Sequence, residues 1–206
     1  MKLMYGPISP FARKVRTAAF ELGLNERIEL QLTEVGPGKK NQAYSANVNP
    51  VRKIPALITD DGVALVDSTV ICEYLDALAG GGKIIPTTGA DRWRVLTQNS
   101  IAQAMCEATV LVRYETWLRP EVLRWSVWTE DQWDRVFSGL AWFEQRASVL
   151  DGPIDVSQLA LGCCLGYMDF RFAGTGWSAR FPHVAAWYGR ISARPSFVQT
   201  APQNPV

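Results

Sequence analysis

Three short segments near the start of the chain combine residue types that could hold an anion and an extended peptide. The first is the run S-P-F-A-R-K-V-R, in which Ser9 stands at the expected start of a helix. A hydroxyl at that place lies beside backbone N–H groups that have no partner inside the helix, and the helix dipole favours negative charge there. Such a position suits a thiolate or an oxyanion. The alternative is a plain N-cap, because serine is common at that position.

The second segment is N-P-V-R-K-I-P-A-L, which begins at Asn49 and leads into an apolar run. Pro55 is allowed at the first position of a strand, and the bond that precedes a proline can be cis. A cis bond would leave the backbone N–H and C=O of Ile54 unpaired at a sheet edge, where they could bind an extended peptide. The alternative is an ordinary entry from a loop into a strand.

The third segment is V-D-S-T, where an expected strand ends and a helix begins. The hydroxyl and backbone N–H of Ser68 could bind a carboxylate, and Asp67 could bind an ammonium group. The alternative is again a helix cap, because caps outnumber ligand sites.

Short strands and helices must position these three segments. Before the run Gly80-Gly81-Gly82, the pattern predicts strands at residues 2–5, 27–32, 55–59 and 63–66 and helices at 10–22 and 70–78. Residues 27–32 alternate polar and apolar side chains, which is typical of a half-buried strand. The N-terminal part is therefore predicted to be a small α/β unit.

Every periodic segment after the glycine run is helical. Helix starts are predicted at Thr88, Thr129, Asp155 and Pro182, and Pro195 is expected to end the last long helix. The helix after Asp155 is apolar nearly all round, which predicts a buried position at the centre of a bundle. The predicted domains are residues 1–79 and 85–206.

Composition excludes several function classes. The chain has 206 residues, with 21 Lys and Arg against 20 Asp and Glu, so no basic field favours nucleic acid. No apolar stretch is long enough to cross a membrane, and charged residues interrupt the N-terminus as they would not in a signal peptide. With His183 as the single histidine, neither a metal site nor a Ser/His/Asp hydrolase triad is expected. Four scattered cysteines indicate a reducing cytosol.

The three segments, in this order and followed by a helical tail, resemble the soluble glutathione S-transferase superfamily along nearly the whole chain. The run I-D-V-S-Q-L-A-L stands where that superfamily has its N-capping box and buried helix. The runs G-Y-M-D-F-R and R-P-S-F resemble a bacterial branch of the superfamily, here with serine at the first motif. The resemblance implies a thioredoxin-like, glutathione-binding α/β domain followed by an all-α helical bundle. It also implies a homodimer in the cytoplasm that acts in detoxification, with glutathione as co-substrate and no metal.

The resemblance implies roles for individual residues. The hydroxyl of Ser9 would donate a hydrogen bond to the glutathione sulfur, as in serine-type members. The backbone of Ile54 would pair with the cysteinyl part of glutathione, with Pro55 in a cis bond, and Lys53 lies at a glutathione-contact position.

The remaining glutathione contacts follow from the same resemblance. Asp67 and Ser68 would hold the γ-glutamyl end, and Lys40 would meet the glycyl carboxylate. Asp67 stands where many relatives have glutamate, so its side chain is shorter by one methylene and the contact is expected to be weaker or bridged by water.

Serine at position 9 favours one type of chemistry over another. Members with cysteine there transfer thiols through a mixed disulfide, which a serine cannot form. We therefore expect conjugation, in which the glutathione thiolate attacks a small hydrophobic electrophile. The alternatives are a noncatalytic glutathione- or ligand-binding protein and an adaptor for a partner protein, because the fold alone does not determine function.

The electrophile is expected to bind between the domains, where ligand clefts often form. Candidate lining residues are Phe11, Met105, Ala108, Tyr114 and Trp117, each with packing in the helical core as the alternative.

Charged residues in the first motif and in the helical part also carry expectations. Arg13, one turn beyond Ser9, could add positive potential at the helix start or pair with a surface carboxylate, and exposure is favoured because arginine is usually exposed. Asp169 and Arg171 are expected to form an internal ion pair.

Overall fold

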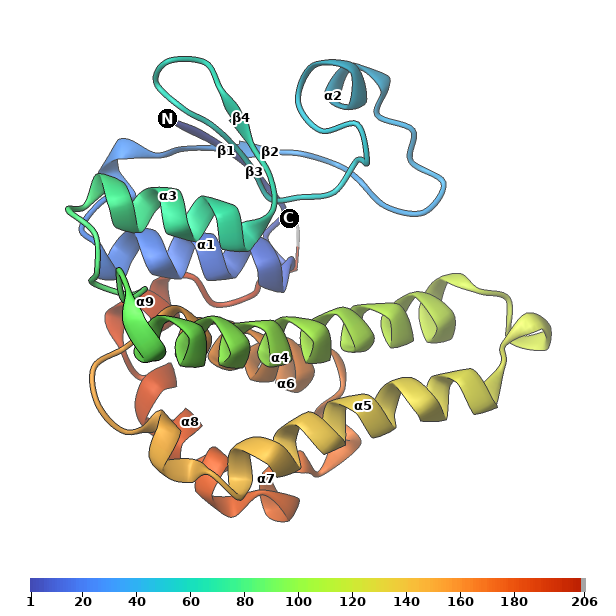
Figure 1. The fold of residues 1–206 in the computed structure, drawn as a ribbon. Helices are drawn as coiled ribbons and strands as arrows, with labels where there is room; N and C mark the ends of the chain where they lie inside the picture. Colours follow the sequence, from blue (N-terminus) through green and yellow to red (C-terminus); the bar gives the residue numbers. More distant parts are fainter. Residues whose placement is uncertain (205–206) are drawn as a thin grey trace. The chain divides into compact units, whose positions relative to one another are not determined.

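The computed structural model describes residues 1–204, which form two compact units (Figure 1). One unit comprises Met1–Arg92 together with the segment that begins at Pro195, and the other comprises Trp93–Arg194. The C-terminal segment therefore packs with the α/β part of the chain, whereas the sequence pattern assigned it to the helical domain.

The α/β unit is built on a four-stranded sheet in the order β2-β1-β3-β4. The strands are β1 (Lys2–Tyr5), β2 (Glu29–Leu32), β3 (Ala56–Ile58) and β4 (Ala64–Leu65). Strand β1 runs parallel to β2 and antiparallel to β3, and β4 runs antiparallel to β3. This mixed sheet with its crossover helix is the predicted thioredoxin-like fold, so the fold class is confirmed.

The burial of β2 differs from the prediction. All four of its residues are exposed, and Leu32 retains 62% of its accessible surface. The alternation of polar and apolar residues predicted one buried face, but β2 is an edge strand.

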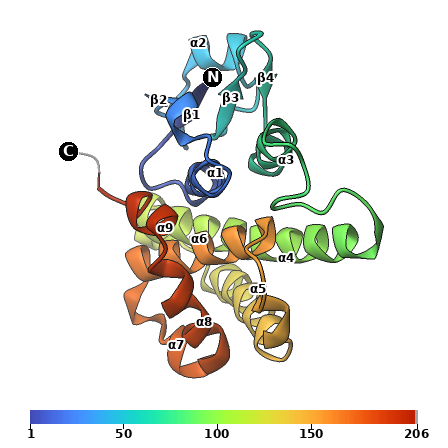
Figure 2. The ribbon, with the colours of Figure 1, turned by 90° about the vertical axis from the view of Figure 1, so that its left-hand side faces the viewer.

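Helices cover both faces of the sheet. Figure 2 shows α1 (Pro10–Glu21) and α3 (Ser68–Leu78) on one face and α2 (Gln42–Asn47) on the other. A 3₁₀ turn, η1 (Asn25–Arg27), leads from α1 into β2. On the α2 face, Met4, Tyr44 and Ala56 form a small buried cluster.

A short C-terminal helix, α9 (Pro195–Gln199), packs on α1. The Thr17 and Thr200 hydroxyls lie 3.0 Å apart, and the Ser196 hydroxyl donates to Glu21 at 2.5 Å. Pro195 opens this helix, because proline suits a first helical position, and the preceding long helix ends shortly before it, at Ser192.

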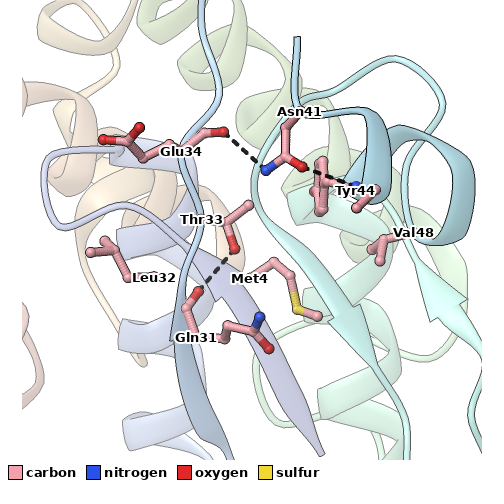
Figure 3. Close-up of a pocket in the computed structure, with 9 residues that line it drawn as sticks. Met4, Gln31, Leu32, Thr33, Glu34, Asn41, Tyr44 and Val48 are labelled. Carbon is pink, nitrogen blue, oxygen red and sulfur yellow. Dashed lines mark hydrogen bonds between the residues drawn. The ribbon is translucent and has the colours of Figure 1, made fainter. Parts of the chain in front are cut away.

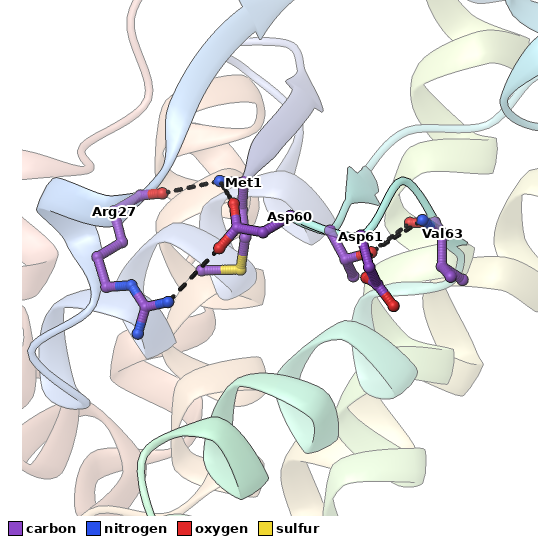
Figure 4. Close-up of polar contacts among 6 residues, drawn as sticks. Met1, Arg27, Asp60, Asp61 and Val63 are labelled. Atoms are coloured by element: carbon purple, nitrogen blue, oxygen red, sulfur yellow. Dashed lines mark hydrogen bonds and ion pairs between the residues drawn. The ribbon is translucent and has the colours of Figure 1, made fainter.

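The turn between β3 and β4 is fixed by Thr59. Its backbone N–H donates to the Val63 carbonyl at 2.9 Å, and its hydroxyl accepts from the Val63 N–H at 2.9 Å. In the same turn, Asp60 accepts from the Met1 ammonium at 2.5 Å and pairs with Arg27 at 3.5 Å (Figure 4). These contacts tie the hairpin to the start of β1 and to the turn before β2.

Asp76 organises the chain where α3 ends. Its buried carboxylate accepts backbone N–H groups from Gly82 at 2.8 Å, Lys83 at 3.0 Å and Ile84 at 2.8 Å. The glycine run thus forms a defined turn, and Gly80, Gly81 and Gly82 all have positive φ.

The second unit is all helical. Its long helices are α4 (Gly89–Arg113), which begins in the first unit, α5 (Ser126–Glu144), α6 (Val156–Arg171) and α8 (Pro182–Ser192), with a short α7 (Trp177–Arg180). A π-helical turn η2 (Tyr114–Leu118) and 3₁₀ turns η3 (Glu121–Leu123), η4 (Ala147–Leu150) and η5 (Ala173–Thr175) connect them. The first thirteen residues of α6, from Val156 to Met168, are buried, which confirms the predicted central helix.

Two of the predicted helix starts have different outcomes. Asp155 caps α6 by accepting the N–H groups of Ser157 at 2.9 Å and Gln158 at 3.1 Å, as predicted. The start predicted at Thr129 is wrong, because α5 begins three residues earlier and the Thr129 hydroxyl donates to the Trp125 carbonyl within the helix.

Candidate functional site

The strand register brings the three sequence segments to one end of the sheet. Met4 pairs with Ala56 and Leu57 pairs with Leu65, so β1 ends where β3 begins and where β4 ends. The loop after β1 carries Ser9, the loop before β3 carries Ile54, and the residues after β4 lead into Ser68. The topology of the α/β unit therefore gathers these segments, which lie far apart in the sequence.

Ser9 is the N-cap of α1. Its backbone is extended, and its Oγ accepts a hydrogen bond from the Ala12 N–H at 3.3 Å. Pro10 follows at the first helical position and has no N–H of its own, and the first turn holds no acidic residue. The cap uses a lone pair of the hydroxyl, so its hydrogen can still be donated to a ligand.

The loop before β3 presents a free peptide unit. The Ile54–Pro55 bond is cis, and within residues 1–204 neither the N–H nor the C=O of Ile54 forms a hydrogen bond. A Cβ at Gly6 would lie 3.0 Å from the Ile54 side chain, so the loop after β1 passes close to Ile54. The side chain of Lys53 is exposed.

The start of α3 carries the third segment. The Val66–Asp67 bond is cis, and Asp67 Oδ1 caps the helix by accepting from Thr69 N–H at 2.8 Å and Val70 N–H at 3.4 Å. Ser68 is buried at the first helical position. Lys14 of α1 donates from Nζ to the Thr69 hydroxyl at 3.1 Å, which places a buried positive charge beside this helix start.

Lys40 lies in the exposed loop between β2 and α2. The neighbouring Lys39 pairs with Glu34 at 3.0 Å, and no contact joins Lys40 to the other candidate residues in the described part of the chain. The loop leaves from the same end of the sheet, because β2 runs parallel to β1.

The candidate electrophile contacts fall into two groups. Met105 and Ala108 are buried, and Met105 packs against Gly139 of α5, so both are core residues of the helical unit. Tyr114 and Trp117 keep 38% and 60% of their surface exposed, and the Arg113 guanidinium lies 4.5 Å above the Trp117 ring. Burial raises the pKa of Tyr114. Phe11 on α1 is half-buried.

The structure corrects the expectation for Arg13. Its side chain is only 6% exposed, donates from Nη2 to the Phe197 carbonyl at 3.1 Å, and lies 5.3 Å from the Phe197 ring. The contact comes from α9, so neither a surface position nor a surface carboxylate partner describes this arginine.

The expected ion pair between Asp169 and Arg171 is also not present among residues 1–204. Asp169 accepts from the Trp177 indole N–H at 2.7 Å, and Arg171 lies 4.7 Å from the Phe170 ring. Arg171 lies near Tyr167 on the same helix face, and burial raises the pKa of Tyr167 to about 12 against the opposing effect of that arginine.

Two buried polar residues near Ile54 are missing from the sequence-based site. The Tyr44 hydroxyl donates to the Lys53 carbonyl at 2.6 Å, and the Asn49 amide donates to the same oxygen at 2.8 Å. Burial raises the pKa of Tyr44 to about 12, although the hydrogen bond with Asn49 lowers it slightly. Asn49 belongs to the second motif, whereas nothing around Tyr44 signals its role.

A groove of about 430 Å³ lies beside α2, and none of the candidate glutathione contacts lines it (Figure 3). Tyr44 forms part of its wall, and Asn41 bridges it by donating to the Glu34 carbonyl at 3.4 Å and accepting from the Tyr44 N–H at 3.1 Å.

No group of three or more His, Cys, Asp or Glu residues that could hold a metal occurs in the described residues, and none of the helices there could span a membrane.

Family models match both parts of the chain. The model for the glutathione S-transferase N-terminal domain matches residues 3–83, and the model for the glutathione S-transferase C-terminal domain matches residues 126–190. The chain belongs to the glutathione S-transferase superfamily. The three gathered segments all fall within the first match.

Individual relatives extend along the whole chain. A glutathione transferase family member from Pseudomonas fluorescens Pf-5, solved with bound glutathione, is 39% identical, with 98% of this chain and 99% of that chain covered and a TM-score of 0.95. A structure of a family member from the same organism with bound S-(propanoic acid)-glutathione is also 39% identical, with 99% and 100% covered and a TM-score of 0.90. The uncharacterized GST-like protein YibF of Escherichia coli K12 is 26% identical over 98% of both chains.

Proposed function

We propose that this chain is a glutathione transferase that stabilises the thiolate of bound glutathione for attack on a small hydrophobic electrophile. The observation that carries the proposal is the Ser9 hydroxyl at the start of α1, at the end of the sheet where the Ile54 peptide is free and α3 begins. The glutathione-bound relative from Pseudomonas fluorescens supports the choice of ligand.

Thiolate stabilisation has a clear physical basis at this position. A free thiol has a pKa near 8.5, so only a few per cent is ionised at neutral pH. A hydroxyl donor and a helix N-terminus both favour the charged form. Each unit by which the pKa falls corresponds to about 1.4 kcal/mol.

The other roles follow the chemistry of the gathered groups. Ile54 offers both a donor and an acceptor to the cysteinyl backbone, and Lys53 adds an exposed positive charge beside it. Asp67 and Ser68 hold the γ-glutamyl end, where the carboxylate of Asp67 also caps α3 through Oδ1. Lys40 pairs with the glycyl carboxylate from its exposed loop.

The electrophile contact is proposed for exposed aromatic side chains. Tyr114 and Trp117 are accessible, and Phe11 is partly so, whereas Met105 and Ala108 belong to the core. The relative with bound S-(propanoic acid)-glutathione supports a thioether as the type of product that such a protein accommodates.

The test is the ultraviolet thiolate absorbance of bound glutathione as a function of pH. The wild type should show a thiol pKa well below 8.5, and Ser9→Ala should raise it and lower turnover by roughly 10- to 1000-fold. Ser9→Thr keeps both the hydroxyl and the helix cap, so it should retain most of the thiolate, which separates ligand chemistry from loss of the cap. Unchanged turnover in Ser9→Ala would exclude Ser9 as the thiol-activating group.

The alternative is a noncatalytic glutathione- or ligand-binding protein. Its supporting observation is the short Asp67 side chain, which already serves as a helix cap. Calorimetric binding of glutathione without thiolate formation, and without conjugation across a panel of electrophiles, would favour this alternative. A stable protein partner in a pull-down would favour an adaptor.

Family membership also supports the proposals that the protein is a homodimer and that it acts in the cytoplasm in detoxification. Sedimentation equilibrium of the full chain tests the dimer directly. A mass of one chain at micromolar concentration would exclude it.

A further inference from the structure

The Lys53 carbonyl accepts two hydrogen bonds from buried side chains. The Tyr44 hydroxyl lies 2.6 Å from this oxygen and the Asn49 amide nitrogen lies 2.8 Å from it. Tyr44 is 6% exposed and Asn49 is 2% exposed, so water competes little for either donor. Two donors of fixed position therefore set the direction of this carbonyl.

That direction also sets the direction of the Ile54 N–H. The Lys53–Ile54 bond is trans, and a trans peptide unit is planar with its C=O and N–H pointing opposite ways. The N–H of Ile54 therefore points away from Tyr44 and Asn49. It has no hydrogen-bond acceptor within residues 1–204, so it is available to a ligand.

Both donors are themselves held by the fold. Tyr44 packs against Met4 and Ala56 of the sheet, and its N–H is bound by the Asn41 side chain at 3.1 Å. The Asn49 side-chain oxygen accepts from the Val51 N–H at 3.1 Å, which shapes the turn before Lys53.

Tyr44 remains protonated over the working range of pH. Burial raises its pKa to about 12, so its hydroxyl stays a donor throughout an assay between pH 6 and 9. The position of the Lys53 carbonyl should therefore not change with pH in that range.

We propose that Tyr44 and Asn49 are positioning residues that orient the Lys53–Ile54 peptide for backbone pairing with glutathione. This inference rests on the proposed function, in which the Ile54 N–H binds glutathione. Neither side chain touches the ligand in this scheme. They act by reducing the reorganisation that the loop would otherwise undergo when glutathione binds.

The first test measures glutathione affinity by calorimetry on the full chain. Tyr44→Phe removes one hydroxyl and keeps the ring in its cluster, so it should weaken binding about fivefold, as for one hydrogen bond. Turnover at saturating glutathione should stay close to the wild-type value, because the loss lies in binding. Tyr74→Phe is the matched control, since the Tyr74 hydroxyl has no hydrogen bond among the described residues, and it should bind glutathione as the wild type does.

The second test reports on the peptide itself. Hydrogen exchange of the Ile54 amide, followed by nuclear magnetic resonance, should slow when S-methylglutathione is added to the wild type. In Tyr44→Phe and in Asn49→Ala this protection should fall together with affinity. A purely structural role would lower the melting temperature and leave the protection by saturating ligand unchanged.

The outcomes separate this inference from the proposed function. If the wild type binds glutathione and both variants bind it equally well, the positioning role is refuted and the proposed function stands. If the wild type binds no glutathione, both are refuted. Asn49→Ala also removes the bond to Val51, so Tyr44→Phe with a normal melting temperature is the decisive variant.

Discussion

Asp76 should contribute more to the stability of the α/β unit than any exposed carboxylate. Its two oxygens accept the backbone N–H groups of Gly82, Lys83 and Ile84, of which the bond from Ile84 is buried and the other two are partly buried. A hydrogen bond to a charged group contributes about 1.5–3 kcal/mol when it is buried, and less when water can replace the lost partner. Counting the Ile84 bond in full and the other two at about half, we expect Asp76→Ala to cost about 4 kcal/mol.

The assay must report on the α/β unit, because Asp76 lies there. All eight tryptophans lie between Trp93 and Trp187, so tryptophan fluorescence reports on the helical unit. Urea unfolding should therefore be followed by far-ultraviolet circular dichroism, together with hydrogen exchange of the α3 amides. Asp76→Asn is the matched control, because Oδ1 still accepts from Lys83 and Ile84, and it should cost about half as much. A loss below about 1 kcal/mol for Asp76→Ala, or equal losses for the two variants, would refute the assignment.

Two further predictions concern the helical unit. A methyl group added in Gly139→Ala would overlap the Met105 side chain, so we expect a loss of about 1–3 kcal/mol in tryptophan-monitored unfolding, and a stabilising effect of the same change in a Met105→Ala background. Burial raises the pKa of Glu144, but hydrogen bonds from the Val184 and His183 N–H groups and from the His183 ring outweigh it, so the pKa lies below its ordinary value. A lowered native pKa means that the stabilisation is present above the unfolded-state pKa near 4.3 and is lost as pH falls through the native value. Glu144→Gln should therefore destabilise the protein at pH 7 by about 1 kcal/mol and make little difference at about pH 3, and a pH-independent difference would contradict this account.

The features that could be predicted from sequence are those that depend on neighbouring residues. Ser9 and Asp155 each cap a helix as predicted, because a cap needs only a side-chain oxygen and the N–H groups two or three residues later. Asp67 also caps a helix, which was the alternative given for its segment. The hairpin at Thr59 and the buried α6 also follow from local pattern. The small α/β unit and the helical second part were predictable for the same reason, whereas the thioredoxin-like fold was expected from the family resemblance.

The features that could not be predicted depend on residues that are distant in the sequence. Arg13 is buried because α9 returns to α1, and a single sequence gives no sign of that contact. Similarly, α5 begins before Thr129 because Glu115 accepts the Trp125 N–H at 2.9 Å, which anchors the chain four residues before Thr129. A capping box at Thr129 is locally acceptable, but the tertiary contact determines the helix start.

The candidate site depends both on neighbouring residues and on residues that are distant in the sequence, so only part of it can be predicted from the sequence. A serine N-cap and an anion-binding serine use the same N–H groups, so local sequence cannot distinguish them at Ser9. The proposal that Ser9 also meets a ligand rests on the neighbours that the sheet register supplies: a free Ile54 peptide and a second helix start at Ser68. The direction of that peptide depends in turn on Tyr44, whose segment shows no periodic pattern and whose hydroxyl reaches Lys53 nine residues later. Motifs therefore indicate the groups that we propose meet the ligand, whereas the residues that orient those groups become visible only once the chain is folded.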